Sequence, residues 1–259
     1  MKIFFSENNV DYESYTFSYA IYAIKESNEE LTDIYNKGFL PYTGNPKIDA
    51  EVFYLARSVR VNLKEFFDNS ENRRISRRID PLNVKMEVFE KSNFDLEGVC
   101  FKSFCRAYIE ERIGPDQISR ERWEYILKRE TATHIFKFST EEKQKGYVLA
   151  AVTREVVHYW FAFFDINHLQ THSIGKWIML SVIRWAKANG KSFVYLGTAY
   201  RQGAMYKIRD HRGLEYWNGV HWSNDVNRLK TLCNNDMALK LVDEFKLLSD
   251  PNSFLEKVD

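Results

Sequence analysis

The pattern of apolar and polar positions is clearest between residues 133 and 188. Three short apolar runs, separated by polar loops, predict a meander of strands at residues 133–139, 146–152 and 156–165. Residues 173–188 then place apolar side chains nearly all round a helix. This pattern predicts a long helix that is buried on several sides.

A further strand, predicted at residues 193–196, completes a strand, crossover helix and strand unit. We expect its cleft to open beyond the strand ends at Asp165 and Gly197. Asn218-Gly219, between two short apolar runs, predicts a hairpin. The predicted fold class is therefore α/β or α+β, with a mixed sheet and a central helix.

The N-terminal part of the chain mixes short strand and helix patterns. A strand is predicted at residues 15–21, a helix that begins after Ser27 ends at Gly38, and residues 52–63 form another strand. Residues 81–97 are weakly patterned, so we place a domain boundary there. The predicted division is a basic N-terminal α/β domain over residues 1–98 and a C-terminal domain over residues 99–259.

Charge is balanced overall but clustered locally. The 259 residues carry a net charge of +1, which gives no general attraction to nucleic acid. Residues 57–78 nevertheless hold seven basic against three acidic side chains. A helix from Asp68 or Ser70 to just before Pro81 places four arginines on one side: Arg73, Arg74, Arg77 and Arg78. Two interpretations stay open, a solvated helix face and a surface that contacts phosphates.

Cysteine usage indicates a reducing compartment. The three cysteines, Cys100, Cys105 and Cys233, form no CxxC pair and leave an odd count. This argues against a disulfide framework and a four-cysteine metal site, and favours the cytoplasm. Cys105 fits the apolar face of a helix that ends before Gly114, so we interpret it as a core residue. No run of about 18 apolar residues predicts a membrane span.

The predicted sheet and central helix resemble the fold of acetyl-CoA-dependent N-acetyltransferases, the GNAT fold. Those enzymes seat a pyrophosphate on a loop of the form Q/R-x-x-G-x-G/A at a helix start. Here a single glycine, Gly175, is followed by Lys176 and Trp177. We therefore expect acetyl-CoA to bind poorly.

Two stretches of the chain together resemble the aminoacyl-tRNA protein transferases, arginyl and leucyl. They cover about half of the chain, in the family's order. The first resembles the family's G-[FW], R-I-x-V-x-x-F and S-Q-R-R-x-x-x-R segments at Gly38-Phe39, residues 60–66 and residues 72–78. The second resembles Y-x-Y-D-P, S-L-G, Y-L-G-Y and M-x-Y-K at Phe164-Asp165, residues 172–175, residues 195–197 and residues 205–207.

The chain departs from the family pattern at four positions. The cysteine pair that family members carry before the R-I segment falls on Phe53 and Ala56, so we expect no zinc or iron–sulfur cluster and no metal site. Ile166 replaces the proline after Asp165, and Thr198 replaces the tyrosine after Gly197. The last two changes bear on substrate choice.

The resemblance implies transfer of an amino acid, arginine or leucine, from aminoacyl-tRNA to the α-amine of proteins that begin with Asp or Glu. Aminoacyl-tRNA is then a co-substrate, and no cofactor is needed. The residues implied are Asp165, Gly197 and Tyr195 for catalysis, Tyr206, Lys207, Arg209, His172 and Ser173 for substrate binding, and Arg60, Arg73, Arg74, Arg77 and Arg78 for tRNA.

Alternatives remain open from the sequence. His158 and His172 compete with Asp165 as a general base, although His158 fits a core or sheet position better. Tyr206 suits a pocket wall or plain core packing. A CoA-dependent N-acetyltransferase is the alternative enzyme, and an RNA-binding module with an inactive transferase fold is the alternative that has no activity.

Overall fold

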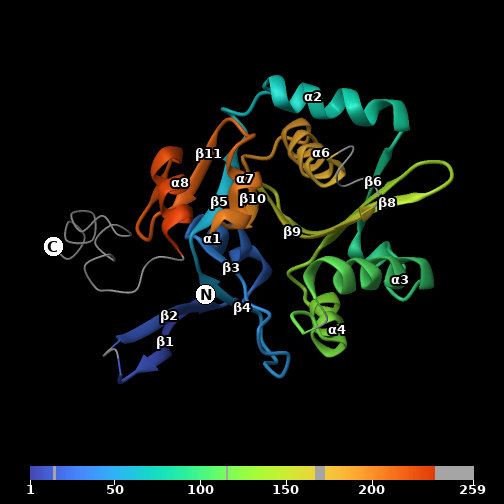
Figure 1. The fold of residues 1–259 in the computed structure, drawn as a ribbon. Helices are drawn as coiled ribbons and strands as arrows, with labels where there is room; N and C mark the ends of the chain where they lie inside the picture. Colours follow the sequence, from blue (N-terminus) through green and yellow to red (C-terminus); the bar gives the residue numbers. More distant parts are fainter. Residues whose placement is uncertain (14–15, 115, 167–172, 237–259) are drawn as a thin grey trace.

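Two sheets organise the protein. The computed structural model describes residues 1–13, 16–114, 116–166 and 173–236. A four-stranded sheet has the order β1-β2-β4-β3, and an eight-stranded sheet has the order β12-β11-β5-β10-β9-β8-β7-β6 (Figure 1). Helices cover both faces of the larger sheet.

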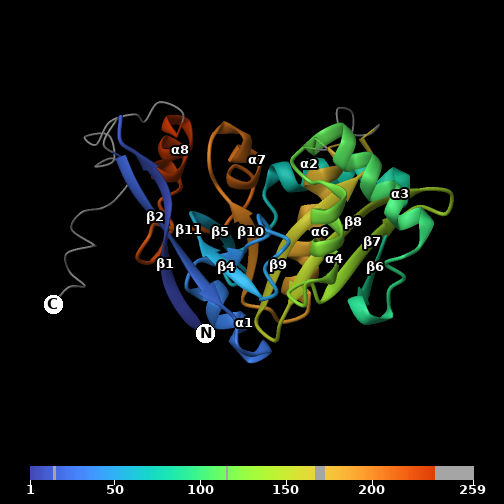
Figure 2. The ribbon, with the colours of Figure 1, turned by 90° about the horizontal axis from the view of Figure 1, so that it is seen from below.

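The small sheet is N-terminal and antiparallel. Its strands are β1 (Lys2–Asp11), β2 (Thr16–Ile24), β3 (Phe39–Pro41) and β4 (Val52–Leu55). Helix α1 (Leu31–Asn36) lies between β2 and β3. The helix ends just before Gly38, as predicted, and the φ of 84° at Gly38 turns the chain into β3. Figure 2 shows the β1–β2 hairpin on the side of the molecule away from β6.

The large sheet is mixed, with a single parallel pair of strands, β9 and β10, among the described residues. The predicted meander is confirmed as β7 to β9, and the Asn218-Gly219 hairpin as β11 and β12. The strands are β5 (Ser58–Asn62), β6 (Lys85–Glu90), β7 (His134–Ser139), β8 (Gln144–Val152), β9 (Val156–Phe164), β10 (Phe193–Thr198), β11 (Leu214–Trp217) and β12 (Trp222–Ser223).

Helices α2 and α6 lie over one face of the large sheet, and α3 and α4 lie over the other (Figure 1). The predicted central helix and the predicted arginine-bearing helix are thus confirmed as α6 and α2. The helices are α2 (Ser70–Ile79), α3 (Val99–Tyr108), α4 (Arg120–Lys128), α6 (Ile174–Ala188), α7 (Met205–Ile208) and α8 (Val226–Asn235). Short helical turns lie at Asn28–Glu30, Asp80–Leu82, Lys91–Asn93, Ile109–Ile113 and Gln202–Ala204.

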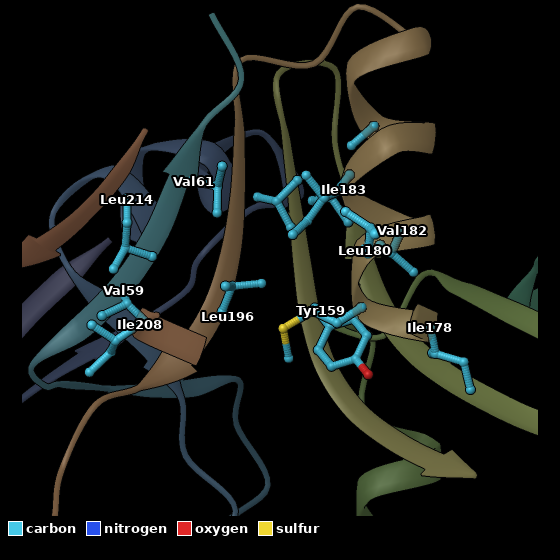
Figure 3. Packing of buried hydrophobic residues seen from close by; sticks show 14 of the residues in the cluster. Val59, Val61, Tyr159, Ile178, Leu180, Val182, Ile183, Leu196, Ile208 and Leu214 are labelled. Atoms are coloured by element: carbon cyan, nitrogen blue, oxygen red, sulfur yellow. The ribbon is translucent and has the colours of Figure 1, made fainter. Parts of the chain in front are cut away.

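Alternate residues of β9 and β10 face different cores. Tyr159 and Leu196 pack with α6, whereas Tyr195 belongs to the cluster that the small sheet covers. Figure 3 shows the α6 side, with Leu196 and Tyr159 beside Ile183 of the helix. Cys105 is fully buried in a third cluster under α3 and α4, which confirms it as a core residue. Among the described helices, none is both long and apolar enough to cross a membrane.

The segment over residues 52–63 differs from the prediction of one strand. It forms two strands, because the chain leaves the small sheet after β4 and enters the large sheet as β5, between β10 and β11. Val59 and Val61 of β5 pack in the same core as Leu214 (Figure 3). The large sheet therefore continues across the boundary predicted between residues 98 and 99. Predicted helix beyond residue 236 lies outside the described residues.

Candidate active site

A cleft opens where the two parallel strands of the large sheet separate. β9 and β10 pair at three positions, which end at Tyr195 opposite His158. β9 then continues to Phe164 beside β8. Trp160 is an extra residue in β9, because Tyr159 and Phe161 lie opposite consecutive residues of β8. A bulge of this kind bends and twists a strand, which fits the divergence of β9 from β10.

The cleft has a volume of about 370 Å³, which suits a small substrate or the end of a larger one. Aromatic and cationic side chains surround it. Its walls come from four places: the end of α3 and the turn after it, β9, the start of α6, and β10 with α7. The lining residues are Tyr108, Arg112, Tyr159, Trp160, Ala162, Phe164, Ser173, Gly175, Lys176, Met179, Leu196, Tyr206 and Lys207.

Lys207 places a cation on the wall that β10 and α7 form. Its Nζ donates a hydrogen bond to the carbonyl oxygen of Thr198 at 3.0 Å. Burial lowers the pKa of the Lys207 ammonium to about 8, so the group stays largely protonated at neutral pH. No carboxylate of the described residues forms an ion pair with it. Gly197, with a φ of 84°, lies beside this ammonium: a Cβ atom there would be 3.5 Å from Nζ.

The start of α6 forms another wall of the cleft. A Cβ atom on Gly175 would lie 2.6 Å from the ring of Phe164, so glycine allows α6 to approach β9 closely. Ser173, in the left-handed region with a φ of 55°, precedes the helix and lines the cleft. Lys176 extends from the first turn and forms an ion pair with Asp210 at 2.6 Å.

Three phenols gather in the cleft. Burial raises the pKa of Tyr159 well above its ordinary value, raises that of Tyr108 to about 12, and raises that of Tyr206. All three hydroxyls therefore stay protonated at neutral pH and can donate hydrogen bonds. The Tyr159 hydroxyl has no hydrogen-bond partner among the described residues, and Figure 3 shows its ring between Leu196 and Ile178.

Asp165 follows directly on β9 but does not line the cleft. Its carboxylate forms an ion pair with the Nζ of Lys145 at 3.0 Å, and both side chains are largely buried. The predicted catalytic aspartate therefore has a partner within the protein.

Tyr195 and Arg60 lie inside the protein, on the face of the sheet opposite α6. The Tyr195 hydroxyl donates to Asn36 at 2.7 Å, and it accepts a hydrogen bond from Arg60 at 3.2 Å. Arg60 also forms an ion pair with Glu215 at 2.7 Å, and its guanidinium lies 4.0 Å from the centre of the Trp222 ring. These buried groups connect β5, β10 and β12, and neither Tyr195 nor Arg60 lines the cleft.

Some of the other predicted residues line the cleft and some lie outside it. Tyr206 and Lys207 line the cleft with Ser173, whereas the exposed Arg209 lines a neighbouring depression that Lys176 and Tyr206 share. The four arginines of α2 are all exposed, opposite a buried face formed by Asn72, Ile75 and Ile79. His172 lies outside the described residues.

His158 is buried, and its Nδ1 lies 3.0 Å from the hydroxyl of Tyr35. Burial lowers the pKa of His158 to about 3, and the nearby Lys207 adds to the effect. It is a neutral core residue, as its sequence position favoured.

Sequence reasoning missed Tyr108 and Arg112. The spacing of these two residues predicts a helix but not a site, and only the packing of α3 against β9 brings them to the cleft.

The positions that hold cysteines in the resembled family are filled by apolar side chains. Phe53 is fully buried in the core of the small sheet and Ala56 is buried beside it, so these positions do not fit a zinc ion or an iron–sulfur cluster. Among the described residues, no cluster of histidine, cysteine or acidic side chains is arranged to hold a metal ion.

Solved structures of low sequence identity align with much of this chain. They include the C-terminal domain of a putative lysylphosphatidylglycerol synthetase from Agrobacterium fabrum (TM-score 0.44, 12% identity, 85% of this chain and 74% of that chain). L-PGS from Bacillus licheniformis has a TM-score of 0.43 and 14% identity over 82% of this chain and 73% of that chain. A GCN5-related glucosamine N-acetyltransferase region of a fungal β-N-acetylglucosaminidase has a TM-score of 0.41 and 10% identity over 75% of this chain and 22% of that chain.

Sequence comparison adds a family to these structures. No curated protein matched the chain. Residues 101–217 match the family model described as arginine-tRNA-protein transferase, C terminus. Every residue that lines the cleft lies within this span. The part of the chain that forms the cleft is therefore similar to the C terminus of arginine-tRNA-protein transferases.

Proposed function

We propose that this protein transfers an aminoacyl group, arginyl or leucyl, from charged tRNA to the α-amine of protein N-termini that begin with Asp or Glu. One observation carries the proposal: the cleft, whose whole lining lies in the matched span, holds the Lys207 ammonium, which has no carboxylate partner in the part of the chain that the structure describes. An acidic first residue of the acceptor supplies that partner. The charge-assisted hydrogen bond fixes the neighbouring α-amine near the ester.

The reaction is aminolysis of an ester. The neutral α-amine attacks the carbonyl carbon, a C–N bond forms, and the C–O bond to the terminal ribose breaks. The proton that the amine loses goes to the departing ribose oxygen. Because an α-amine has a pKa of about 7.7–8.0, a useful fraction is neutral near pH 7. Catalysis then rests largely on positioning and on stabilisation of the oxyanion.

Tyr159 is suited to stabilise the oxyanion. Its hydroxyl stays protonated, lines the cleft and has no hydrogen-bond partner among the described residues, so it is available to donate to the developing negative oxygen. Asp165, paired with Lys145, has a weaker case as a general base. A catalytic contribution from the backbone at Gly197, beside Lys207, stays a prediction.

We infer that the exposed arginines of α2 contact the phosphates of tRNA. Asn69, which caps the start of α2, donates a hydrogen bond to the Asp210 carbonyl at 3.0 Å, and the Asp210 carboxylate forms the ion pair with Lys176 of the cleft. The start of α2 is therefore close to the mouth of the cleft. An exposed cationic helix in this position suits the acceptor end of a charged tRNA.

The test uses purified protein, total charged tRNA and peptides that differ only at residue one. We expect a peptide that begins with Asp or Glu to gain the mass of one amino acid, and that mass identifies the amino acid. A parallel reaction contains acetyl-CoA in place of tRNA. Acetylation there, with no gain of mass from charged tRNA, would refute the proposal.

A further inference from the structure

A second concave surface shares one lining residue, Trp160, with the cleft. This groove, about 690 Å³ in volume, lies between the small sheet, the start of α4 and β9. We call it the tyrosine groove. Its lining residues are Tyr19, Ala20, Ile21, Tyr22, Pro41, Tyr42, Thr43, Gly44, Tyr54, Leu55, Arg122, Trp160, Phe161 and Tyr200.

The groove and the cleft share Trp160, the bulged residue of β9. The small sheet packs on Ala151, Val156 and Tyr195, whereas α6 packs on the alternate residues of the same strands. The groove therefore lies on the face of the sheet away from α6. A molecule that lies in it contacts Trp160, which also lines the cleft.

The wall of the groove is a run of aromatic rings in edge contact. The ring centres of Tyr22 and Tyr42 are 5.5 Å apart, and those of Tyr42 and Tyr54 are 6.2 Å apart. Burial raises the pKa of Tyr54 to about 12 and raises that of Tyr22, so these phenols stay neutral. Rigid rings with a hydroxyl at one end bury apolar area and also bond to backbone amides.

The tyrosine groove and the cleft differ in charge. Within the described ranges, no carboxylate lines the tyrosine groove, and Arg122, the cation among its lining residues, donates hydrogen bonds to the Gln117 carbonyl and the Thr43 hydroxyl. The cleft has Arg112 and Lys176, of which Lys176 is paired with Asp210, and α2 begins beside it. RNA binding depends on neutralised phosphates, so the α2 and α6 side suits tRNA and the tyrosine groove suits an uncharged chain.

We propose that the tyrosine groove binds the polypeptide that follows the first residue of the acceptor. This inference rests on the proposed function. It means that the acceptor and the charged tRNA approach the cleft from opposite faces of the sheet. The protein then recognises several acceptor residues and not the first alone. Apolar and aromatic side chains that follow the first residue favour binding, because they pack on the tyrosine rings.

The test compares an acceptor dipeptide with an eight-residue peptide that has the same first two residues, at saturating charged tRNA. We expect the longer peptide to have a KM about tenfold lower. The double variant Tyr19→Ser/Tyr42→Ser raises the KM of the longer peptide toward that of the dipeptide. It leaves the KM of the dipeptide and the affinity for tRNA unchanged. Tyr19→Ser alone, at a side chain that is 63% exposed, changes KM in the same direction without a threat to folding.

Phe5→Ser is the matched control, because this exposed ring on β1 does not line the groove. The inference fails if KM does not depend on peptide length. It also fails if the double variant weakens tRNA binding instead, which would make the groove an RNA site. Fluorescence polarisation of a labelled eight-residue peptide separates this failure from that of the proposed function. Peptide binding that Tyr19→Ser weakens, without any transfer from charged tRNA, refutes the function and supports the groove.

Discussion

Replacing Lys207 with methionine tests whether the cleft trades stability for substrate binding. Burial lowers the pKa of Lys207 from 10.5 to about 8. This difference corresponds to about 3 kcal/mol of lost stability when the lysine is charged. The hydrogen bond to Thr198 stabilises the folded protein by about 1 kcal/mol and offsets part of this loss. We therefore expect Lys207→Met to stabilise the protein by about 2 kcal/mol at pH 7.

The effect has a defined pH dependence. Below pH 8 the lysine is charged in both the folded and the unfolded state, so the cost of burial is complete. Between pH 8 and 10.5 the folded state releases its proton first, and the stability of the unchanged protein rises. Near pH 10 we expect the advantage of Lys207→Met to fall to about zero.

Urea unfolding at pH 7 and pH 10 measures this difference, and Lys143→Met, at an exposed lysine, is the control. In the transfer assay, Lys207→Met lowers kcat/KM for a peptide that begins with Asp by about 10- to 150-fold, the value of a hydrogen bond between charged groups. A peptide that begins with Ala is not affected by this loss. Destabilisation at pH 7, or equal losses for both peptides, would refute the reasoning.

Three further variants test the site. The double variant Arg74→Ala/Arg78→Ala should weaken binding of every tRNA alike and reduce the slope of log affinity against log salt by roughly one for each lost contact. Its free energy of unfolding should stay within about 0.5 kcal/mol of that of the unchanged protein. An unchanged slope would mean that these arginines form only a solvated helix face. Gly175→Ala forces a Cβ atom against Phe164 and should lower the free energy of unfolding by about 1–3 kcal/mol, measured by thermal unfolding. An unchanged stability would contradict the close packing. Tyr159→Phe should reduce kcat about 10²-fold with KM unchanged; a KM effect alone would remove it from catalysis.

Local patterns predicted most of the helices and strands. The strands over residues 133–165, the helix after Ser173 and the turn at Asn218-Gly219 each depend on neighbours in sequence, so periodicity and turn chemistry identify them. Residues 52–63 were misjudged, because the run stays apolar while the chain passes from one sheet to another. Periodicity cannot show which sheet a strand joins.

The site was predictable in part for a related reason. The cleft at the ends of two parallel strands followed from the order of elements, and Lys207 followed from its place after a strand. The partners of Arg60 and Tyr195 lie far along the chain, at Glu215 and Asn36, so nothing local marks these polar residues as internal. Asp165 was predicted at its correct place on the strand end, but its ion pair with Lys145 depends on the register of β8 and β9.

The position of β5 also has a consequence for how the chain folds. This strand fills the middle of the large sheet, and hydrogen bonds from its Arg60 reach residues 135 and 155 positions later. Pairings at such separations form slowly, because a long loop must close before they are made. A fragment that begins at residue 99 lacks the strand between β10 and β11, and both would keep an unpaired edge. During synthesis, residues 58–62 leave the ribosome long before their partners exist, so we expect the sheet to close only when the chain is nearly complete.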